Sequence, residues 1–140
     1  MISNGIQVLV VEDDPVTRSA YTELLAHWGF ATRAAHNGLA ALIEIHRAKP
    51  DILLSDLEMP GMNGFELLSI VRRLYPEMPL VAMSGGYPCD KVPAGVMADA
   101  FYAKSAGPSS RLRGILSRIA GAGVRVNGTQ RPANMTLNAI

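Results

Sequence analysis

The chain has 140 residues, a size typical of one domain that can bury a substantial hydrophobic core. Apolar residues make up 49% of the chain and the formal net charge is +1, a combination that excludes an intrinsically disordered protein. No apolar run approaches the ~20 residues that a membrane-spanning helix requires, and a single cysteine, Cys89, excludes an internal disulfide and suits a reducing cytoplasm.

Strand signals and helix signals alternate along the chain. The first apolar run, "IQVLVV", is rich in β-branched residues and shows no polar alternation, which is typical of a strand buried on both faces. Similar runs follow at regular intervals. We expect five strands, at residues 6–11, 30–35, 51–56, 79–84 and 99–104.

Helix-start signals lie between these strands. Asp14 is placed to cap a helix with Pro15 in its first position, where the missing N–H costs nothing. A second helix is expected from Asn37 to about Ala48, and a third begins at Asn63, which forms a capping-box pattern with the acid at residue 66. The last helix is expected to stop at residue 121. Between strands four and five, two prolines limit any helix to a short one within 93–98.

Apolar residues recur at helical spacing in each of these four longer helices. They are Val16, Ala20 and Leu24 in the first, Leu39, Leu42 and Ile43 in the second, Phe65, Leu68 and Val71 in the third, and Leu112, Ile115, Leu116 and Ile119 in the last. Strands alternating with helices predict an α/β fold with a doubly wound parallel sheet and helices on both faces.

Charge is distributed unevenly. All 12 acidic residues precede residue 100, whereas six of the 13 basic residues follow it. We interpret this as a solvated helix face followed by a flexible basic tail, or a linker to an effector domain, over 121–140, after a domain at 1–120. The tail is too short to be a nucleic-acid-binding module, so we expect no direct nucleic-acid binding by this domain.

Chemically active residues follow the strands. Glu12 and Asp13 come after strand one, Asp56 ends strand three, Ser84 ends strand four and Lys104 ends strand five. The carboxyl ends of parallel strands lie at one edge of the sheet, and function in such folds sits at that edge. The sequence therefore predicts that three carboxylates, one hydroxyl and one ammonium group converge there.

This set of groups suits magnesium-dependent phosphoryl transfer. Clustered carboxylates form a hard oxygen site for Mg²⁺, and the ion would relieve the repulsion between neighbouring acids. Asp56 would be the nucleophile, ionised at neutral pH without help from a histidine base. Lys104 would pair with one phosphoryl oxygen and Ser84 would donate a hydrogen bond to another.

Four motifs carry a resemblance to a known family. The segments "VLVVEDDP", "LLSDLEMPGMNGFELL", "VAMSG" and "FYAKS" occur in the order and spacing of response regulator receiver domains of two-component systems, over about residues 6 to 120. The resemblance implies the flavodoxin-like strand order 2-1-3-4-5. It also implies a signalling domain, not an enzyme with an external substrate, that accepts phosphate on Asp56 from a sensor histidine kinase or a histidine phosphotransfer protein.

The resemblance also assigns site roles. Asp13 and Asp56 would ligate Mg²⁺ together with the backbone carbonyl of Glu58, while Glu12 would act through water. Ser84 and Lys104 fill the hydroxyl and lysine positions of the family. The aromatic switch position, which would turn inward after phosphorylation and reshape a protein-binding surface, is occupied by Phe101.

Two features depart from the family pattern. Family members usually have proline after the lysine, but Ser105 follows Lys104 here. Because a cis bond before serine would cost about 3 kcal/mol, we expect a trans bond. The stretch between Ser84 and Lys104 is shorter than usual, so we expect a short or irregular fourth helix.

Two other functions remain open at this point. One is a magnesium-dependent phosphatase acting on small molecules, although such enzymes usually place the nucleophile after strand one. The other is a phosphate-independent interaction module on the same fold. The expected partners are a kinase or phosphotransfer protein and a downstream protein or effector domain, with a homodimer possible. We expect a cytoplasmic location and no membrane contact.

Overall fold

Five strands and four helices form the part of the chain that the computed structural model describes, which is residues 5–86, 91–104 and 109–123. The strands are β1 (Gln7–Val11), β2 (Ala31–Ala35), β3 (Ile52–Asp56), β4 (Leu80–Ser84) and β5 (Ala100–Ala103). The helices are α1 (Pro15–His27), α2 (Gly38–Arg47), α3 (Gly64–Leu74) and α4 (Ser109–Gly123).

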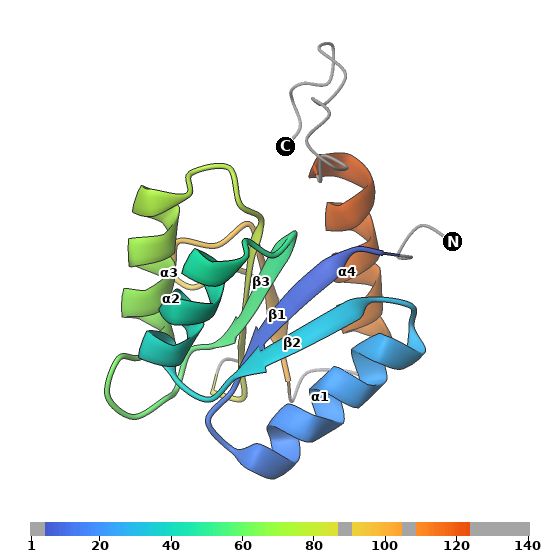
Figure 1. Ribbon diagram of the computed structural model, residues 1–140, viewed down its shortest axis with the longest axis horizontal. Coiled ribbons are helices and arrows are strands. Elements are labelled where there is room, and N and C mark those ends of the chain that lie inside the picture. The colour runs from blue at the N-terminus through green and yellow to red at the C-terminus, as the bar shows by residue number, and fades with distance from the viewer. Residues whose placement is uncertain (1–4, 87–90, 105–108, 124–140) are drawn as a thin grey trace.

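The strands pair in parallel in the order β2-β1-β3-β4-β5 (Figure 1). This confirms the predicted doubly wound topology. Every residue of β3 and β4 is buried, as expected for apolar strands covered on both faces. Each strand is shorter than its predicted range by one or two terminal residues, a difference within the usual uncertainty of strand ends.

Helices cover both faces of the sheet and enclose two hydrophobic layers. Residues of α2 and α3 pack on one face, and residues of α1 and α4 pack on the other. Alternate residues of one strand therefore enter different layers. Phe101 of β5 belongs to the α2/α3 layer and Tyr102 belongs to the α1/α4 layer, as expected for neighbouring residues of a strand.

The predicted helix starts are correct. The Asp14 carboxylate caps α1 and accepts hydrogen bonds from the backbone N–H of Thr17 at 2.9 Å and from its hydroxyl at 2.7 Å. Asn63 and Glu66 form the reciprocal capping box of α3. These local bonds satisfy N–H groups that have no partner within the helix, so they fix where each helix begins.

The apolar residues of α1 do not form the inward face that a spacing of four suggests. Val16 is 77% exposed, whereas Leu25 is fully buried and Trp28 lies against the same layer. Residues four apart rotate about 40° along a helix axis, because 3.6 residues make one turn. The row from Val16 to Leu24 therefore drifts around the helix, and only Leu24, at its end, packs against the core.

Helix α2 turns its small residues towards the core. Gly38 and Ala41 are buried together with Ile45, whereas Leu39 and Ile43 are 61% and 54% exposed. A Cβ atom on Gly38 would lie 2.6 Å from the Met62 sulfur, so a larger residue at the start of α2 would require the Met62 side chain to move. Of the three residues predicted for one apolar face, only Leu42 packs partly against the core.

The apolar faces of α3 and α4 are those predicted. Leu68, Val71, Leu112 and Leu116 are fully buried. The other predicted members pack against the same layers: Phe65, Ile115 and Ile119. Helix α4 ends two residues beyond the predicted stop at residue 121.

No helix occurs in the described residues 91–99, so the short helix predicted within 93–98 is wrong. The backbone makes a turn there, with the N–H of Val96 donating to the carbonyl of Pro93 at 3.1 Å and with Gly95 at a φ of +85°. Proline and a left-handed glycine two residues apart do not support a helical ladder. The irregular connection expected as the alternative is what the structure has.

Several sequence expectations concern residues outside the described ranges. They include the peptide bond before Ser105 and the tail from residue 124 onwards.

None of the helices in the described ranges combines the length and apolar character needed to cross a bilayer.

Candidate functional site

Four strand ends bring the predicted residues together. Glu12 directly follows β1, Asp56 ends β3, Ser84 ends β4 and Lys104 directly follows β5. The backbone N–H of Lys104 donates to the Ser84 carbonyl at 2.9 Å, which continues the β4–β5 ladder to the site. The predicted convergence at the carboxyl edge is therefore present.

Three carboxylates form the acidic part of the site. Glu12, Asp13 and Asp56 each offer an oxygen, and these oxygens lie within 4.8 Å of one another. Glu12 is 3% exposed and Asp56 is 4% exposed, so two of the three acids are shielded from water. The side chain of Arg18 donates to the backbone carbonyls of Glu12 and Asp13 at 2.9 and 3.3 Å, which holds the acidic turn in place.

Lys104 supplies the positive charge. Its ammonium nitrogen lies 3.1 Å from Glu12 Oε1 and 3.5 Å from Asp56 Oδ1. Burial by itself would lower the pKa of Lys104, but the carboxylates of Asp56 and Glu12 raise it above its ordinary value. The amine therefore stays protonated and bridges two buried acids.

Asp56 titrates far from its ordinary range. Burial raises the pKa of Asp56 to about 7; Lys104 opposes this shift, and the charges of Glu12 and Glu58 add to it. The sequence predicted a carboxylate that is simply ionised at neutral pH. In the metal-free chain a pKa of about 7 leaves this carboxyl group only partly ionised at neutral pH, because desolvation and two neighbouring acids outweigh one lysine.

The site has the donor set that a magnesium ion requires. Asp56 Oδ1 is buried and has no hydrogen-bond partner within the described part of the chain. Buried polar atoms without hydrogen-bond partners are rare in folded proteins, and the carboxyl group of Asp56 offers an oxygen within 4.8 Å of oxygens of Glu12 and Asp13. Hard oxygen ligands of this kind suit Mg²⁺, whose charge would also balance the acidic cluster.

The Ser84 hydroxyl binds Glu58 in this structure, a contact different from the one predicted for it. Its side chain is completely buried, and its hydroxyl donates to the Glu58 carboxylate (Oε2) at 2.5 Å. The hydroxyl oxygen accepts from the backbone N–H of Gly86 at 2.9 Å. Sequence reasoning assigned Glu58 a role only through its backbone carbonyl and missed this side-chain contact. The sequence offered one signal for this contact, which is that Glu58 lies two residues after Asp56 on the loop next to strand four.

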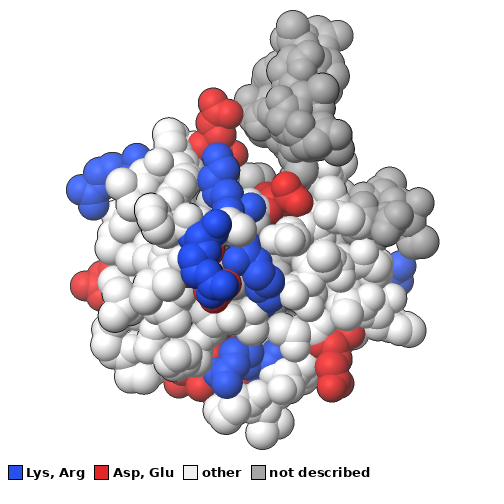
Figure 2. All heavy atoms as spheres, in the orientation of Figure 1, with Lys and Arg blue, Asp and Glu red and all other residues white. Residues whose placement is uncertain are grey.

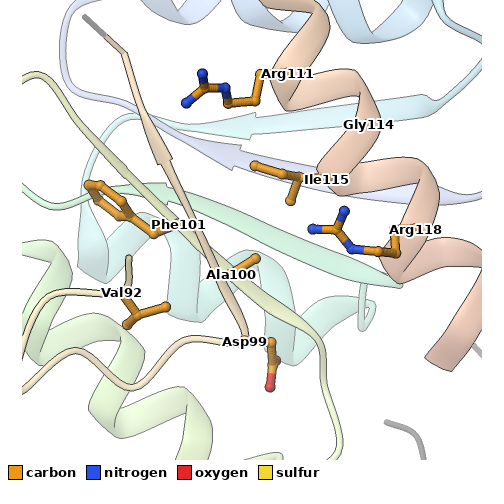
Figure 3. Close-up of a pocket in the computed structure, with 8 residues that line it drawn as sticks. All are labelled: Val92, Asp99, Ala100, Phe101, Arg111, Gly114, Ile115 and Arg118. Atoms are coloured by element: carbon orange, nitrogen blue, oxygen red, sulfur yellow. The ribbon is translucent and has the colours of Figure 1, made fainter. Parts of the chain in front are cut away.

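Phe101 is already buried. Its ring is 2% exposed and packs in the α2/α3 layer beside Val96. Phe101 also borders a groove of about 520 Å³ between the 91–99 segment, β5 and α4, where Figure 3 shows Ile115 and Arg118 extending from α4. The inward position expected after phosphorylation is thus the position that this structure has.

Basic side chains gather near the middle of one face of the molecule, close to a few acidic ones (Figure 2). Ion pairs form among residues of β2 and α2. Arg33 and Arg47 both pair with Glu44, at 2.9 and 3.1 Å. Pairs of this kind between partly exposed groups are structural features of the surface and contribute little to stability.

The fold and the site together define a flavodoxin-like domain with an acidic, lysine-containing pocket at its carboxyl edge. The family model of the response regulator receiver domain matches residues 8–104. The chain therefore belongs to the response regulator receiver domain family, and its function is that of a receiver in two-component signal transduction.

Similar curated proteins include regulators from bacteria and yeast. The response regulator protein FleR of Pseudomonas aeruginosa is 37% identical over 78 residues, which are 56% of this chain and 16% of FleR. The DNA-binding transcriptional regulator NtrC of Escherichia coli is 33% identical over 94 residues, 67% of this chain and 20% of NtrC. The transcription factor SKN7 of Saccharomyces cerevisiae is 33% identical over 84 residues, 60% of this chain and 14% of SKN7. The chain thus spans only a small part of these relatives.

Solved structures show the same fold. The response regulator TrrA from Thermotoga maritima, in complex with Mg²⁺–BeF, has a TM-score of 0.75 and 25% identity, covering 81% of this chain and 98% of TrrA. The chemotaxis protein CheY4 of Vibrio cholerae has a TM-score of 0.68 and 25% identity, covering 80% and 97%.

Proposed function

We propose that Asp56 is the phosphoacceptor of this receiver domain. The observation that carries this proposal is the buried Asp56 carboxylate beside Glu12 and Asp13, whose Oδ1 accepts no hydrogen bond within the described residues and lies 3.5 Å from the Lys104 amine. A nucleophile and the charges that stabilise a transferring phosphoryl group are thus in one pocket.

In the proposed reaction an oxygen of Asp56 attacks the phosphorus of a phosphohistidine on a sensor kinase or a phosphotransfer protein. The P–N bond breaks and its electron pair stays on the imidazole, which leaves as a neutral ring because its other nitrogen keeps a proton. Lys104 pairs with a phosphoryl oxygen, and the Ser84 hydroxyl donates to another after leaving Glu58. The domain catalyses only its own phosphorylation and dephosphorylation.

The proposed ligands of Mg²⁺ are Asp13, Asp56 and the backbone carbonyl of Glu58, with Glu12 acting through water. Bound there, the ion would neutralise charge on the carboxylates and on the phosphoryl oxygens. The buried acids support this assignment, because Lys104 alone balances only part of their charge.

Output is proposed to pass through Ser84 and Phe101 to a protein-binding surface. A downstream protein, a separate effector domain or a second copy of the chain could read that surface, and the location would be cytoplasmic. Phosphorylation adds charge and acceptor oxygens at one point, so a partner that prefers the changed face shifts the equilibrium. We further propose that the receiver unit is 1–120 and that 121–140 is a tail or linker.

The direct test is phosphorylation by acetyl phosphate, followed by intact mass. We expect the wild type to gain one phosphoryl group with Mg²⁺ and none without it, and Asp56→Asn to gain none. Asp14→Asn is the matched control, because it makes the same substitution at an acid next to Asp13 that is not part of the cluster, and asparagine caps a helix equally well.

Equal labelling of wild type and Asp56→Asn would contradict the assignment. Turnover of many equivalents without a stable label would indicate a small-molecule phosphatase. No label on a folded wild type would favour the phosphate-independent interaction module.

A further inference from the structure

The hydroxyl of Ser84 is committed to an acceptor that is not the phosphoryl site. It donates to Glu58 Oε2 at 2.5 Å, a distance typical of a hydroxyl bound to an ionised carboxylate. A serine hydroxyl has a single proton to donate. While it donates to Glu58, it has none to offer a phosphoryl oxygen on Asp56.

The surroundings of Ser84 hold it in this orientation. Its side chain is completely buried, and the backbone N–H of Gly86 donates to its oxygen at 2.9 Å. Glu58 is exposed, so this hydrogen bond joins a buried hydroxyl to a carboxylate at the rim of the pocket. The hydroxyl rotates about a single bond, which makes a second orientation accessible once the carboxylate no longer competes for it.

We propose that the Glu58 carboxylate is a latch that holds the Ser84 hydroxyl away from Asp56 until a phosphoryl group arrives. This inference rests on the proposed function of Asp56. It adds a positioning role for a side chain that the reaction itself does not use, since the predicted metal ligand at this residue is the backbone carbonyl. Substituting the side chain therefore leaves that ligand in place.

The latch makes phosphoryl binding weaker than the pocket would otherwise allow. Releasing the hydroxyl breaks a hydrogen bond to a charged group. The net free energy of such a bond is large enough to change a binding equilibrium at least ~tenfold. A glutamate at this position would also repel the incoming anion, so the two effects must be separated by experiment.

A double-mutant cycle separates the latch from charge repulsion. The proteins are the wild type, Glu58→Ala, Ser84→Ala and the double variant, with Glu58→Gln as a variant that keeps an acceptor but loses the charge. The probe is beryllofluoride with Mg²⁺, and its dissociation constant is measured by titration followed in NMR spectra.

We expect Glu58→Ala to bind beryllofluoride about tenfold more tightly than the wild type, and Glu58→Gln to gain less. In the Ser84→Ala background the gain from Glu58→Ala should shrink to the part that comes from charge repulsion, because no hydroxyl remains to be released. A gain of equal size in both backgrounds would show charge repulsion alone and would overturn the latch.

A second measurement needs neither metal nor phosphoryl analogue. In urea unfolding of the free proteins, Ser84→Ala should destabilise the wild type more than it destabilises Glu58→Ala, because only the former loses the hydrogen bond. Additive effects would overturn the latch even if beryllofluoride binds. All these proteins keep Asp56. If none of them binds beryllofluoride, although urea unfolding shows coupling between Glu58 and Ser84, the proposed function is overturned and the latch has no regulatory role.

Discussion

The Asp56 carboxylate lies in a buried acidic environment whose charge is only partly balanced. Lys104 contacts both Asp56 and Glu12, so one positive charge is shared between two buried carboxylates. Burial raises the pKa of Asp56 to about 7, Lys104 opposes this shift, and the charges of Glu12 and Glu58 add to it. The metal-free pocket thus stores unfavourable electrostatic energy that a divalent ion would relieve.

This shift predicts an unusual pH dependence of stability. Because the folded-state pKa of Asp56 lies above its ordinary value of 3.8, the folded chain binds this proton more tightly than the unfolded chain. The stability that Asp56 contributes is therefore present at acidic pH and is lost as the pH rises from about 4 to about 7. Without Mg²⁺, Asp56→Asn should exceed the wild type in free energy of unfolding by ~2–4 kcal/mol at pH 8, and by less at pH 5.

Urea unfolding of both proteins at the two pH values, in the presence of a chelator, measures this difference. A gap between Asp56→Asn and the wild type that does not change with pH would show that Asp56 has no raised pKa in the folded chain.

At the scale of helices and strands, close backbone contacts position the site. Gly64 begins α3, and a Cβ atom there would lie 2.2 Å from the backbone oxygen of Asp56 and 2.6 Å from the Cα of Leu57. Helix α3 can therefore start where it does only because residue 64 has no side chain. The same contact fixes the loop that follows Asp56.

Gly64→Ala should destabilise the fold by about 1–3 kcal/mol or more, because backbone atoms cannot move aside as a flexible side chain can. The matched control is Gly114→Ala in α4, where no atom lies within 4 Å of the added Cβ. That change should stabilise the helix by about 0.5–1 kcal/mol. Thermal or urea unfolding compares the two, and a neutral Gly64→Ala would contradict the close contact.

The elements differ in how well the sequence predicts them. Strand ends and the convergence of Asp56, Ser84 and Lys104 follow from chain order, because parallel strands place their carboxyl ends together. The inward face of α2 does not follow, because its position depends on how closely Gly38 approaches Met62. The orientation of the Ser84 hydroxyl likewise depends on the position of the Glu58 carboxylate, which no local pattern encodes.

At the scale of the whole molecule, the described residues form the five-stranded sheet of a receiver with helices on both faces. Residues 91–99 form an irregular connection where a helix was expected. The groove bordered by Val92, Phe101 and Ile115 lies on that side of the sheet, next to the edge strand β5. The acidic pocket lies at the carboxyl ends of the same strands, so β5 contributes both to the groove and, through Lys104, to the pocket. Strand β5 therefore connects the pocket around Asp56 directly to this surface.

The most direct test of the central claim is to locate the phosphoryl group after transfer from a phosphohistidine donor in the presence of Mg²⁺. Borohydride reduces an aspartyl phosphate to homoserine, and peptide mass spectrometry then identifies the reduced residue. We predict reduction at residue 56 alone. Reduction at Asp13 or another acid, with Asp56 intact, would contradict the assignment.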